Sequence, residues 1–476
     1  MNKALLFYIL ILSTSEVFTQ DAIARFTATA VEDATQINEL EKYYRDFQLI
    51  TLPTEAIDQF AHATAQPQMQ WFFPNGAYWD VALEVAPIRT EAFALRTITP
   101  AGERRVAIDT DRINTFRGST AGRSVRLTIN HDFIYGIYTA TDGALWYIEP
   151  AKRFAPTAAS NHYVVYRRKD VIPVPNLKCG QTERARGFGP GHGGGAHGGA
   201  RGGCVEMDIA VAVDHTLYED YQTPEEVLNQ IEGVANNVNG NFADDFDSSV
   251  TIRISELLVS TESATDPWYD GQDASTLLES FRDWSIAGGF QSDFDLGQFW
   301  SQRNYTSNNS GSVVGMAFLG AACSNNNYHI LEDFTNSAGY LRVMTAHEIG
   351  HNLGCSHNFD QWDPLCYSGG RPDHIMDPSV SLANVWSGDG QYNCEGNSKG
   401  YVNQFLAENT CLSSCQSYCP KVEGLVADLD RTTPALSLNW AVQEGSSWEV
   451  ILHNMDLQTQ DTFYTAATEL VLTDEI

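Results

Sequence analysis

Residues 345–357 read TAHEIGHNLGCSH, and the fixed positions in this stretch each have a physical reason. On a helix, residues four apart share one face, so His347 and His351 can offer two imidazoles to one metal ion. Glu348 then lies beside the metal, where its carboxylate can take a proton from a water molecule. The stretch therefore predicts a metal-binding helix with its own general base.

The end of the same stretch supplies a third ligand. Gly354 allows the left-handed conformation that ends a helix, so the chain can turn and bring back His357. Three histidines suit zinc and leave its fourth position open. The alternative is a set of unrelated core or surface histidines. It is disfavoured because the whole pattern H-E-x-x-H-x-x-G-x-x-H is present, and not only its first half.

A methionine follows this pattern, in the stretch His374-Ile-Met-Asp-Pro378. Here the sequence resembles the metzincin zinc peptidases, in which a methionine-containing turn lies beneath the metal. We therefore interpret Met376 as this Met-turn, whereas on its own it would be an ordinary core methionine. No tyrosine stands two positions later, so the added tyrosine ligand of astacins and serralysins is not expected.

Composition sets the outer limits. The chain has 476 residues, enough for two or three domains, and its formal charge is −31. This charge argues against nucleic acid or an anionic membrane as a partner. Residues 1–20 combine a charged start with a short apolar run, which predicts a secretory signal peptide, although a buried N-terminal strand is the alternative. No later segment is apolar enough to cross a membrane, so we expect a secreted protein without an integral membrane segment.

Cysteine usage agrees with export. Of nine cysteines, eight fall from Cys204 onward, and an even set in a secreted chain suggests disulfides, whose pairing stays open. Cys179 is left over.

Residues from about 21 to 186 form the first region. Alternating apolar and polar positions at 124–129 and 144–149 predict strands, so we expect this region to be β-rich. The stretches 147–150 and 161–167 resemble the propeptides of reprolysin (adamalysin, ADAM-type) peptidases. The resemblance implies that the propeptide acts as an intramolecular inhibitor of its own enzyme.

Near the end of this region, residues 175–180 read PNLKCG. A lone propeptide thiol can ligate zinc in the open fourth position and keep water out. The segment around Cys179 looks like the cysteine switch of metzincin zymogens. The alternative is a ninth cysteine with no special task.

Residues 187–203 are rich in glycine, cannot build a core and predict a linker. Arg184-Ala-Arg186 just before it would be an accessible cut site for a basic-specific protease.

The third region, residues 204–419, alternates strands and helices, which predicts an α/β sheet. We expect an α/β (α+β) metzincin catalytic domain with a twisted mixed sheet and an active-site helix. The expected elements are strands at 206–213, 250–254 and 313–320, a helix from a capping box at 223–226 and a helix at 273–284.

From about Val205 to Cys411, the order of elements resembles the reprolysin catalytic domain specifically. In that family, the strand matching Gly315, Met316, Ala317 and Phe318 is the sheet edge along which an extended polypeptide substrate lies. A closed-off core strand is the alternative, and the loop 378–386 is a candidate wall of the specificity pocket. One departure is clear, because reprolysins usually place Asp where this chain has Asn358.

The resemblance also implies a second metal and a further domain. Many family members hold calcium far from the zinc, and the matching positions are Glu206, Asp293 and the backbone near Cys411, so both zinc and Ca²⁺ are expected cofactors. Residues 420–476 resemble the first strands of a fibronectin type III sandwich, so this partial segment is expected to be β-sandwich-like.

Together these features predict a secreted zinc metalloendopeptidase made as a latent zymogen. Two alternatives stay open. One is a zinc hydrolase with a non-protein substrate, and the other is a catalytically silent adhesion or binding module of the same fold. Glu348 discriminates the second alternative, because inactive members typically lose this glutamate or a ligand, and this chain keeps all four residues.

Overall fold

A computed structural model describes most of the chain from residue 23 onward. Described are residues 23–64, 66–120, 123–175, 177–181, 204–246, 250–307, 311–358, 374–383, 385–388, 397–408 and 411–415, and the backbone of five strands between 426 and 473. The predicted signal peptide at 1–20, the cut site at 184–186 and the linker at 187–203 lie outside these residues.

The first region is rich in strands, as expected. Its elements are β1 (Ala24–Thr27), β2 (Thr29–Ala30), α1 (Ala34–Leu40), β3 (Phe47–Thr51), α2 (Thr54–Ala63), β4 (Gln68–Phe72), β5 (Tyr78–Ala82), β6 (Glu84–Val85), β7 (Arg89–Thr99), β8 (Gly102–Val106), β9 (Thr115–Thr120), β10 (Arg123–Asn130), β11 (Phe133–Thr139), β12 (Leu145–Pro150), β13 (His162–Arg167) and β14 (Cys179–Gln181). Eight form an antiparallel sheet in the order β2-β3-β13-β12-β11-β10-β9-β6. A second sheet, β1-β4-β5, shares a core with it, in which Trp79 stacks on Tyr138 with 4.6 Å between ring centroids.

The third region supplies the remaining helices and the catalytic sheet. Its elements are β15 (Val205–Val213), α3 (His215–Tyr221), α4 (Pro224–Asp245), β16 (Val250–Ser260), α5 (Ala274–Ile286), β17 (Leu296–Ser301), β18 (Thr306–Ser307), β19 (Gly311–Ser312), β20 (Gly315–Ala317), β21 (Tyr328–Glu332), α6 (Ala338–Asn352), α8 (Ser398–Glu408) and β22 (Ser413–Ser414). β18 and β19 form a small antiparallel pair. Of the predicted capping box, the N-cap half is present, since the Thr223 hydroxyl accepts from the amide of Glu226 over 3.1 Å, while the Glu226 carboxylate pairs with Lys152 over 2.9 Å.

The largest sheet has nine strands in the order β14-β20-β21-β17-β15-β16-β7-β8, with β22 paired to β15. It is mixed, because β20 runs antiparallel to β21 while β21, β17, β15 and β16 are parallel. Along β15, Ile209 and Val211 enter the core on the α4 and α6 side, while Ala210 and Ala212 enter the core that α5 covers. Helices therefore cover both faces, which explains why β15 is apolar on both.

The first region contributes strands to this sheet at both ends. β7 pairs in parallel with β16, and β8 extends the sheet beyond it. At the opposite end, β14 pairs in parallel with β20. The expected propeptide is therefore built into the sheet of the expected catalytic domain, a relationship that the sequence did not indicate.

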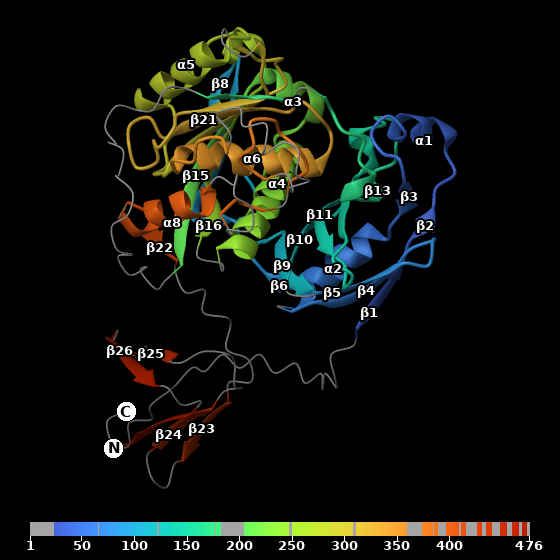
Figure 1. Cartoon of the computed structure of the whole chain (residues 1–476). Helices are drawn as coiled ribbons and strands as arrows, with labels where there is room; N and C mark the ends of the chain where they lie inside the picture. The colour runs from blue at the N-terminus through green and yellow to red at the C-terminus, as the bar shows by residue number, and fades with distance from the viewer. Residues whose placement is uncertain are drawn as a thin grey trace. The chain divides into compact units, whose positions relative to one another are not determined.

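Helix α4 lies between the two main sheets (Figure 1). It contacts β10 and β11 on one side and β16 on the other. Polar residues on this helix are buried and bonded to backbone: the Asn236 amide donates to the carbonyl of Leu127 over 3.1 Å, and Asn239 exchanges two hydrogen bonds with Ile252. The sequence predicted only the apolar side of α4. Its asparagines gave no sign of being buried, because polar residues opposite an apolar stripe usually face water.

The described residues from 23 to 415 form one compact unit, and the strands after 426 belong to another. The second unit contains β23 (Val426–Asp430), β24 (Ala435–Asn439), β25 (Trp448–Asn454), β26 (Thr459–Thr465) and β27 (Glu469–Thr473). They form two antiparallel sheets, β23-β24-β27 and β25-β26. The fibronectin type III resemblance remains a prediction.

Two disulfides lie within the first unit. Cys204 is bonded to Cys415 and Cys323 to Cys411, as an exported chain would use them. Cys179 and Cys355 are buried free thiols, while Cys366, Cys394 and Cys419 lie outside the described residues.

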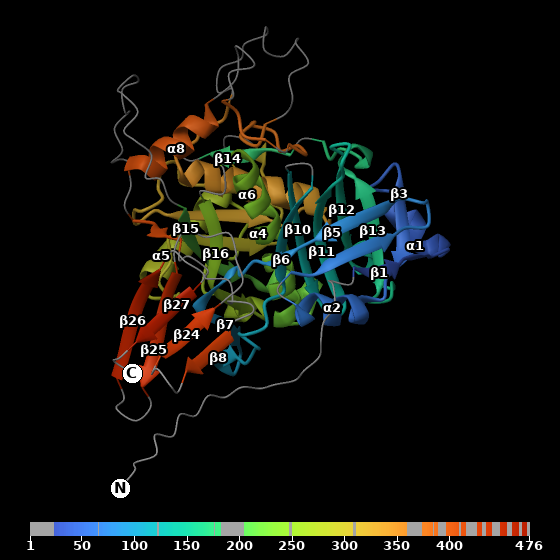
Figure 2. The same cartoon turned by 90° about the horizontal axis from the view of Figure 1, so that it is seen from below.

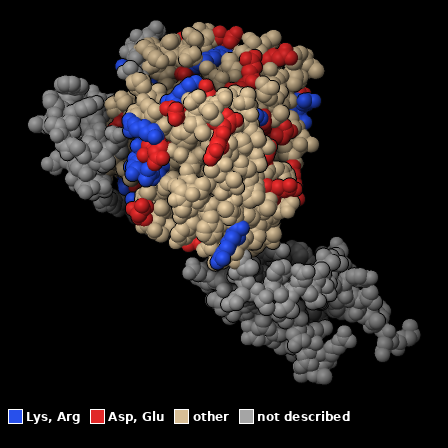
Figure 3. Space-filling model, turned by 90° about the vertical axis from the view of Figure 1, so that its right-hand side faces the viewer, with Lys and Arg blue, Asp and Glu red and all other residues tan. Residues whose placement is uncertain are grey.

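Two further features concern the surface. No helix among the described residues is long and apolar enough to span a membrane. On the face in Figure 3, positive and negative side chains lie close to one another on a largely uncharged surface.

Candidate metal centre

Helix α6 carries the first part of the predicted site and is buried along its whole length. Its apolar residues Ala346 and Ile349, and Leu353 directly after it, are at most 2% exposed. After the helix, Gly354 has φ +95°, and its amide donates to the carbonyl of His351 over 2.9 Å. This left-handed turn brings His357 back, as predicted.

The structure brings four predicted side chains together. The ligand atoms of Cys179, His347, His351 and His357 all lie within 4.8 Å of one another. Nε2 of His347 is 3.2 Å from Nε2 of His357, and Sγ of Cys179 is 3.4 Å from Nε2 of His351. Three imidazoles and one thiol at this spacing are a donor set that zinc prefers.

Hydrogen bonds set which nitrogen of each helical imidazole faces this centre. Nδ1 of His347 donates to the carbonyl of Ile375 over 2.6 Å, and Nδ1 of His351 donates to the carbonyl of Cys355 over 2.7 Å. Both Nε2 atoms therefore present lone pairs to the centre, which is the second-shell arrangement of metal-binding histidines. Burial lowers the pKa of His347 to about 3 and that of His357 to about 4, so both rings are neutral, as ligands must be. The residues therefore fit zinc.

Glu348 is buried beside the same centre. Its Oε1 accepts the thiol proton of Cys179 over 2.9 Å, and its Oε2 has no hydrogen-bond partner among the described residues. Burial raises the pKa of Glu348 well above its ordinary value. A buried carboxylate of high proton affinity has the properties of a general base.

The segment around Cys179 occupies the expected substrate position. In β14, Cys179 is aligned with Gly315 of β20. On the β20 side, the carbonyl of Lys178 also accepts from the amide of Val314, and on the other side the carbonyl of Leu177 accepts from the amide of Val380. The segment therefore lies between β20 and the loop after Met376. Figure 2 shows β14 beside α6, the helix that carries His347 and His351.

Phe318, the fourth residue predicted for the substrate strand, directly follows β20, and its amide donates to the carbonyl of Tyr328 over 3.2 Å. Gly315 is a glycine for a reason, since a Cβ there would lie 2.8 Å from Oε1 of Glu348 and 1.9 Å from the methyl group of Met344. This close approach was not predicted. An isolated glycine within a strand was the available signal.

Met376 lies beneath α6 and is fully buried. A Cβ on Gly350 would meet Sδ of Met376 at 2.5 Å and Cζ3 of Trp386 at 2.9 Å. Gly350 therefore lets the turn approach the helix between its two histidines. Neither Gly350 nor Trp386 was predicted for the site, although a glycine in the middle of a helix indicates such a contact.

Asn358, the departure from the usual aspartate, connects the histidine loop to the turn. Its amide nitrogen donates to Oδ1 of Asp377 over 2.9 Å, and its Oδ1 accepts from the hydroxyls of Ser387 and Ser398. An amide side chain can donate to one partner and accept from the others, whereas the ionised carboxylate of the usual aspartate can only accept.

Glu149 supports the helix that carries the site, and it was not predicted. This buried carboxylate of the first region accepts from the amide of Ala338, the first residue of α6, over 3.2 Å, and also from the hydroxyls of Tyr44 and Tyr166. Ser337 provides no side-chain cap to α6, so Glu149 supplies one from a distant part of the chain. No local pattern could have indicated this contact.

Two other clusters of acidic residues bear on metal binding. Asp214, His215 and Asp266 lie close together, but Arg303 already pairs with both carboxylates, at 2.8 and 2.6 Å. At the expected calcium position, Glu206 pairs with Arg253 over 2.9 Å, while Asp293 is exposed. Calcium binding stays a prediction.

A mixed sheet covered by helices, with three histidines and a glutamate on and after one helix, is the arrangement typical of metzincin metallopeptidases. Residues 205–388 match the model of metallo-peptidase family M12, the reprolysins. This part of the chain is a reprolysin-type metzincin domain.

Three curated relatives support this assignment. The zinc metalloproteinase recombinant fibrinogenase II of Deinagkistrodon acutus is 42% identical over 72 residues, covering 15% of this chain and 29% of the relative. A zinc metalloproteinase-disintegrin-like protein of Cerberus rynchops is 26% identical over 155 residues, or 32% and 24% of the two chains. The hemorrhagic metalloproteinase-disintegrin-like kaouthiagin of Naja kaouthia is 25% identical over 165 residues, or 34% and 38%. The matches thus span well under half of each relative.

Proposed function

We propose that this protein is a secreted zinc endopeptidase made as a latent zymogen. One observation carries the proposal: the ligand atoms of three histidines converge beside Glu348, and the thiol of Cys179 lies among them. This arrangement supplies a metal site, a general base and an inhibitory thiol that can be removed. The reprolysin-type domain around it supports peptide-bond hydrolysis as the reaction.

The catalytic roles follow from the positions of the side chains. His347, His351 and His357 would hold zinc through their Nε2 atoms, and bound zinc would polarise a peptide carbonyl and make water more acidic. Glu348 would accept a proton from that water and pass it to the leaving amine. Met376 supports the histidines from below α6 and touches no reacting atom.

The expected substrate is an extended polypeptide. Once β14 leaves, the main-chain groups of β20 that it occupies become free to pair with another chain. Gly315, Met316, Ala317 and Phe318 would then lie along the substrate. The loop that holds β14 from the other side would form the opposite wall.

Latency follows from the same contacts. As long as β14 is in place, Cys179 occupies the position that water needs, and a thiolate there would complete the coordination of zinc. A cut at Arg184 or Arg186 would separate this segment from the catalytic region. The propeptide would thus act as an inhibitor that belongs to the same chain.

Casein cleavage by the purified, zinc-loaded full chain tests the proposal. Wild type should be silent before limited trypsin treatment and active afterwards, and a zinc chelator should abolish the activity. The matched variant Glu348→Gln should lose activity by about 10²-fold or more while retaining zinc, because only the base is changed. Silence of the processed, zinc-loaded wild type would contradict broad proteolysis and favour a binding module.

A further inference from the structure

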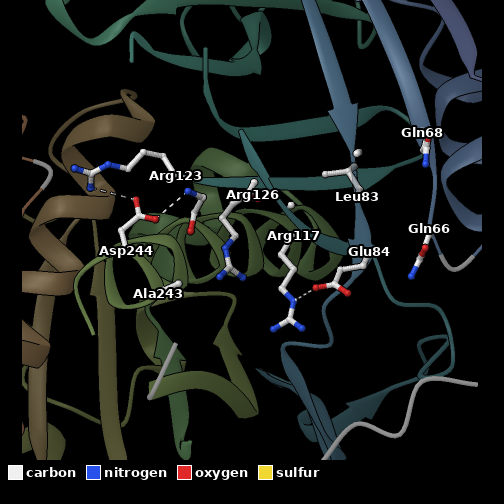
Figure 4. A pocket seen from close by; sticks show the side chains of 13 residues that line it. Gln66, Gln68, Leu83, Glu84, Arg117, Arg123, Arg126, Ala243 and Asp244 are labelled. Atoms are coloured by element: carbon white, nitrogen blue, oxygen red, sulfur yellow. Dashed lines mark hydrogen bonds and ion pairs between the residues drawn. The ribbon is translucent and has the colours of Figure 1, made fainter. Parts of the chain in front are cut away.

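A polar cavity of about 680 Å³ lies away from the metal centre, between strands of the first region and the end of α4 (Figure 4). The residues that line it are Gln66, Gln68, Ala82, Leu83, Glu84, Arg117, Gly118, Ser119, Arg123, Ser124, Arg126, Ala243 and Asp244. Three of them are arginines and two are acids, which leaves one positive charge in excess. This excess stands out in a chain whose formal charge is −31.

Two of the arginines face each other across neighbouring strands. Arg126 of β10 is aligned with Arg117 of β9, so both side chains lie on the same face of the sheet. Figure 4 shows both among the side chains lining the cavity. Like charges directly opposite on adjacent strands destabilise the pair unless something of opposite charge lies between them.

The two acids of the cavity are already engaged. Glu84 pairs with Arg117 over 2.5 Å. Asp244 accepts from the amide of Ser124 over 2.9 Å and lies 3.9 Å from Arg123. Neither acid is within ion-pair distance of Arg126.

Arg126 is therefore a buried charge without an ion-pair partner among the described residues. It is 7% exposed, and it donates only one long hydrogen bond, of 3.4 Å, to the carbonyl of Asn239. Its Nε has no partner among the described residues, and no described carboxylate forms an ion pair with it. Burial and, to a smaller extent, Arg117 lower the pKa of Arg126 to about 10, although Asp244 and Glu84 act in the opposite direction from a distance, so the side chain remains charged at neutral pH. An unpaired buried guanidinium is costly, and an anion would remove that cost.

We propose that this cavity binds an oxyanion, a phosphate, sulfate or carboxylate group carried on a polar molecule. Arg126 is its main ligand, and Arg117 and Arg123 are secondary ones. The planar guanidinium offers two parallel N–H groups to such an anion. The cavity is large enough for a small molecule and not only for a bare ion. Because its walls come from β9 and β10 and from α4, the ligand would link the first region to the catalytic region.

The test is calorimetric titration of the uncut full chain with inorganic phosphate, inorganic sulfate and citrate, at constant ionic strength in chloride. Wild type should bind at least one of them saturably, and the tightest of the three identifies the anion class. Arg126→Met should weaken that binding by about 10-fold or more, because a charge-assisted contact is lost. Arg25→Met, at an exposed position outside the cavity, should bind like wild type.

Absence of saturable binding to wild type, or equal affinity of Arg126→Met, would overturn the proposal and leave water as the partner of Arg126. If Arg126→Met does not fold, Arg123→Met replaces it, because its side chain is 45% exposed. This second variant should bind the anion several-fold more weakly, and unchanged affinity would overturn the proposal. The readout is binding and not proteolysis, so the result is independent of the peptidase activity.

Discussion

Oε1 of Glu348 accepts a hydrogen bond from the thiol of Cys179 over 2.9 Å, although 169 residues separate them in sequence. The contact joins the base of the site to the segment that covers it. Removal of that segment would therefore free both the base and the position that a water molecule needs.

Cys179→Ser should weaken latency. A hydroxyl is a poorer zinc ligand than a thiolate, so the uncut variant should cleave casein at least about 10-fold faster than the uncut wild type. Cys355→Ala is the matched control, since it removes the second buried free thiol of the described residues and should leave the chain latent. Equal silence of the Cys179→Ser variant, with activity after trypsin, would show that strand pairing and not the thiol maintains latency.

Glu149 predicts a pH dependence of stability. Burial raises its pKa from 4.5 to about 7, so the folded chain retains a proton that the unfolded chain releases between these values. The stabilisation from this proton is complete below pH 4.5 and is lost as the pH rises through about 7. Replacing the carboxyl by an amide, as in Glu149→Gln, removes this titration.

The Tm of the uncut wild type and of Glu149→Gln, measured at about pH 5 and about pH 8, tests this dependence. The Tm of Glu149→Gln, relative to the Tm of wild type, should be several °C higher at the higher pH than at the lower one. A constant difference between the two proteins would contradict a titrating cap on α6. Other buried acids affect both proteins alike and cancel in the comparison.

The hairpin of β7 and β8 should hold the rest of the propeptide to the catalytic region after the linker is cut and β14 has left β20. Arg96 of β7 is buried between Glu103 of β8 and Glu256 of β16, and the Glu256 side chain is fully buried. Arg96→Met would leave Glu256 without a cation, which costs about 3–5 kcal/mol.

Size-exclusion chromatography after limited trypsin treatment checks this. The two wild-type fragments should elute together. The fragments of Arg96→Met should begin to dissociate at a protein concentration at least about 100-fold higher than the wild-type fragments do. Arg104→Met, an exposed neighbour on the same hairpin, should behave like wild type. Separation of the wild-type fragments at once would show that the hairpin contributes little.

Gly350→Ala should destabilise the site although alanine favours helices. Alanine in a helix interior gains about 1 kcal/mol over glycine, whereas overpacking a core costs about 1–3 kcal/mol. With Sδ of Met376 only 2.5 Å from the added methyl group, the second effect should dominate. The variant should show a lower Tm and a lower zinc content, and a raised Tm with full zinc would indicate that the turn yields easily.

The site was more predictable than its surroundings. His347, Glu348 and His351 lie on one helix, so helix geometry relates them, and His357 follows His347 by 10 residues through the turn that Gly354 allows. Cys179 could be predicted as a site residue because it is the odd cysteine in a chain expected to be exported, where cysteines usually pair. Glu149 carries no such signal, since its partner Ala338 is 189 residues away.

The fold shows the same limit. The apolar run at 313–320 predicted a long strand, yet β20 spans only Gly315–Ala317. Its neighbours Val313 and Val314 are buried without belonging to the strand, and apolar runs report burial rather than hydrogen bonding. Likewise, β7 reads as a strand of the first region, and its pairing with β16 depends on long-range contacts that no local pattern encodes.

X-ray absorption at the zinc edge, on the zinc-loaded chain before and after trypsin treatment, tests the central claim most directly. The account predicts three nitrogen ligands and one sulfur at about 2.3 Å in the uncut chain, with oxygen replacing sulfur after cleavage. The same spectrum of uncut Cys179→Ser should lack the sulfur. An uncut wild type whose zinc has no sulfur ligand, or retains it after full activation, would contradict the account.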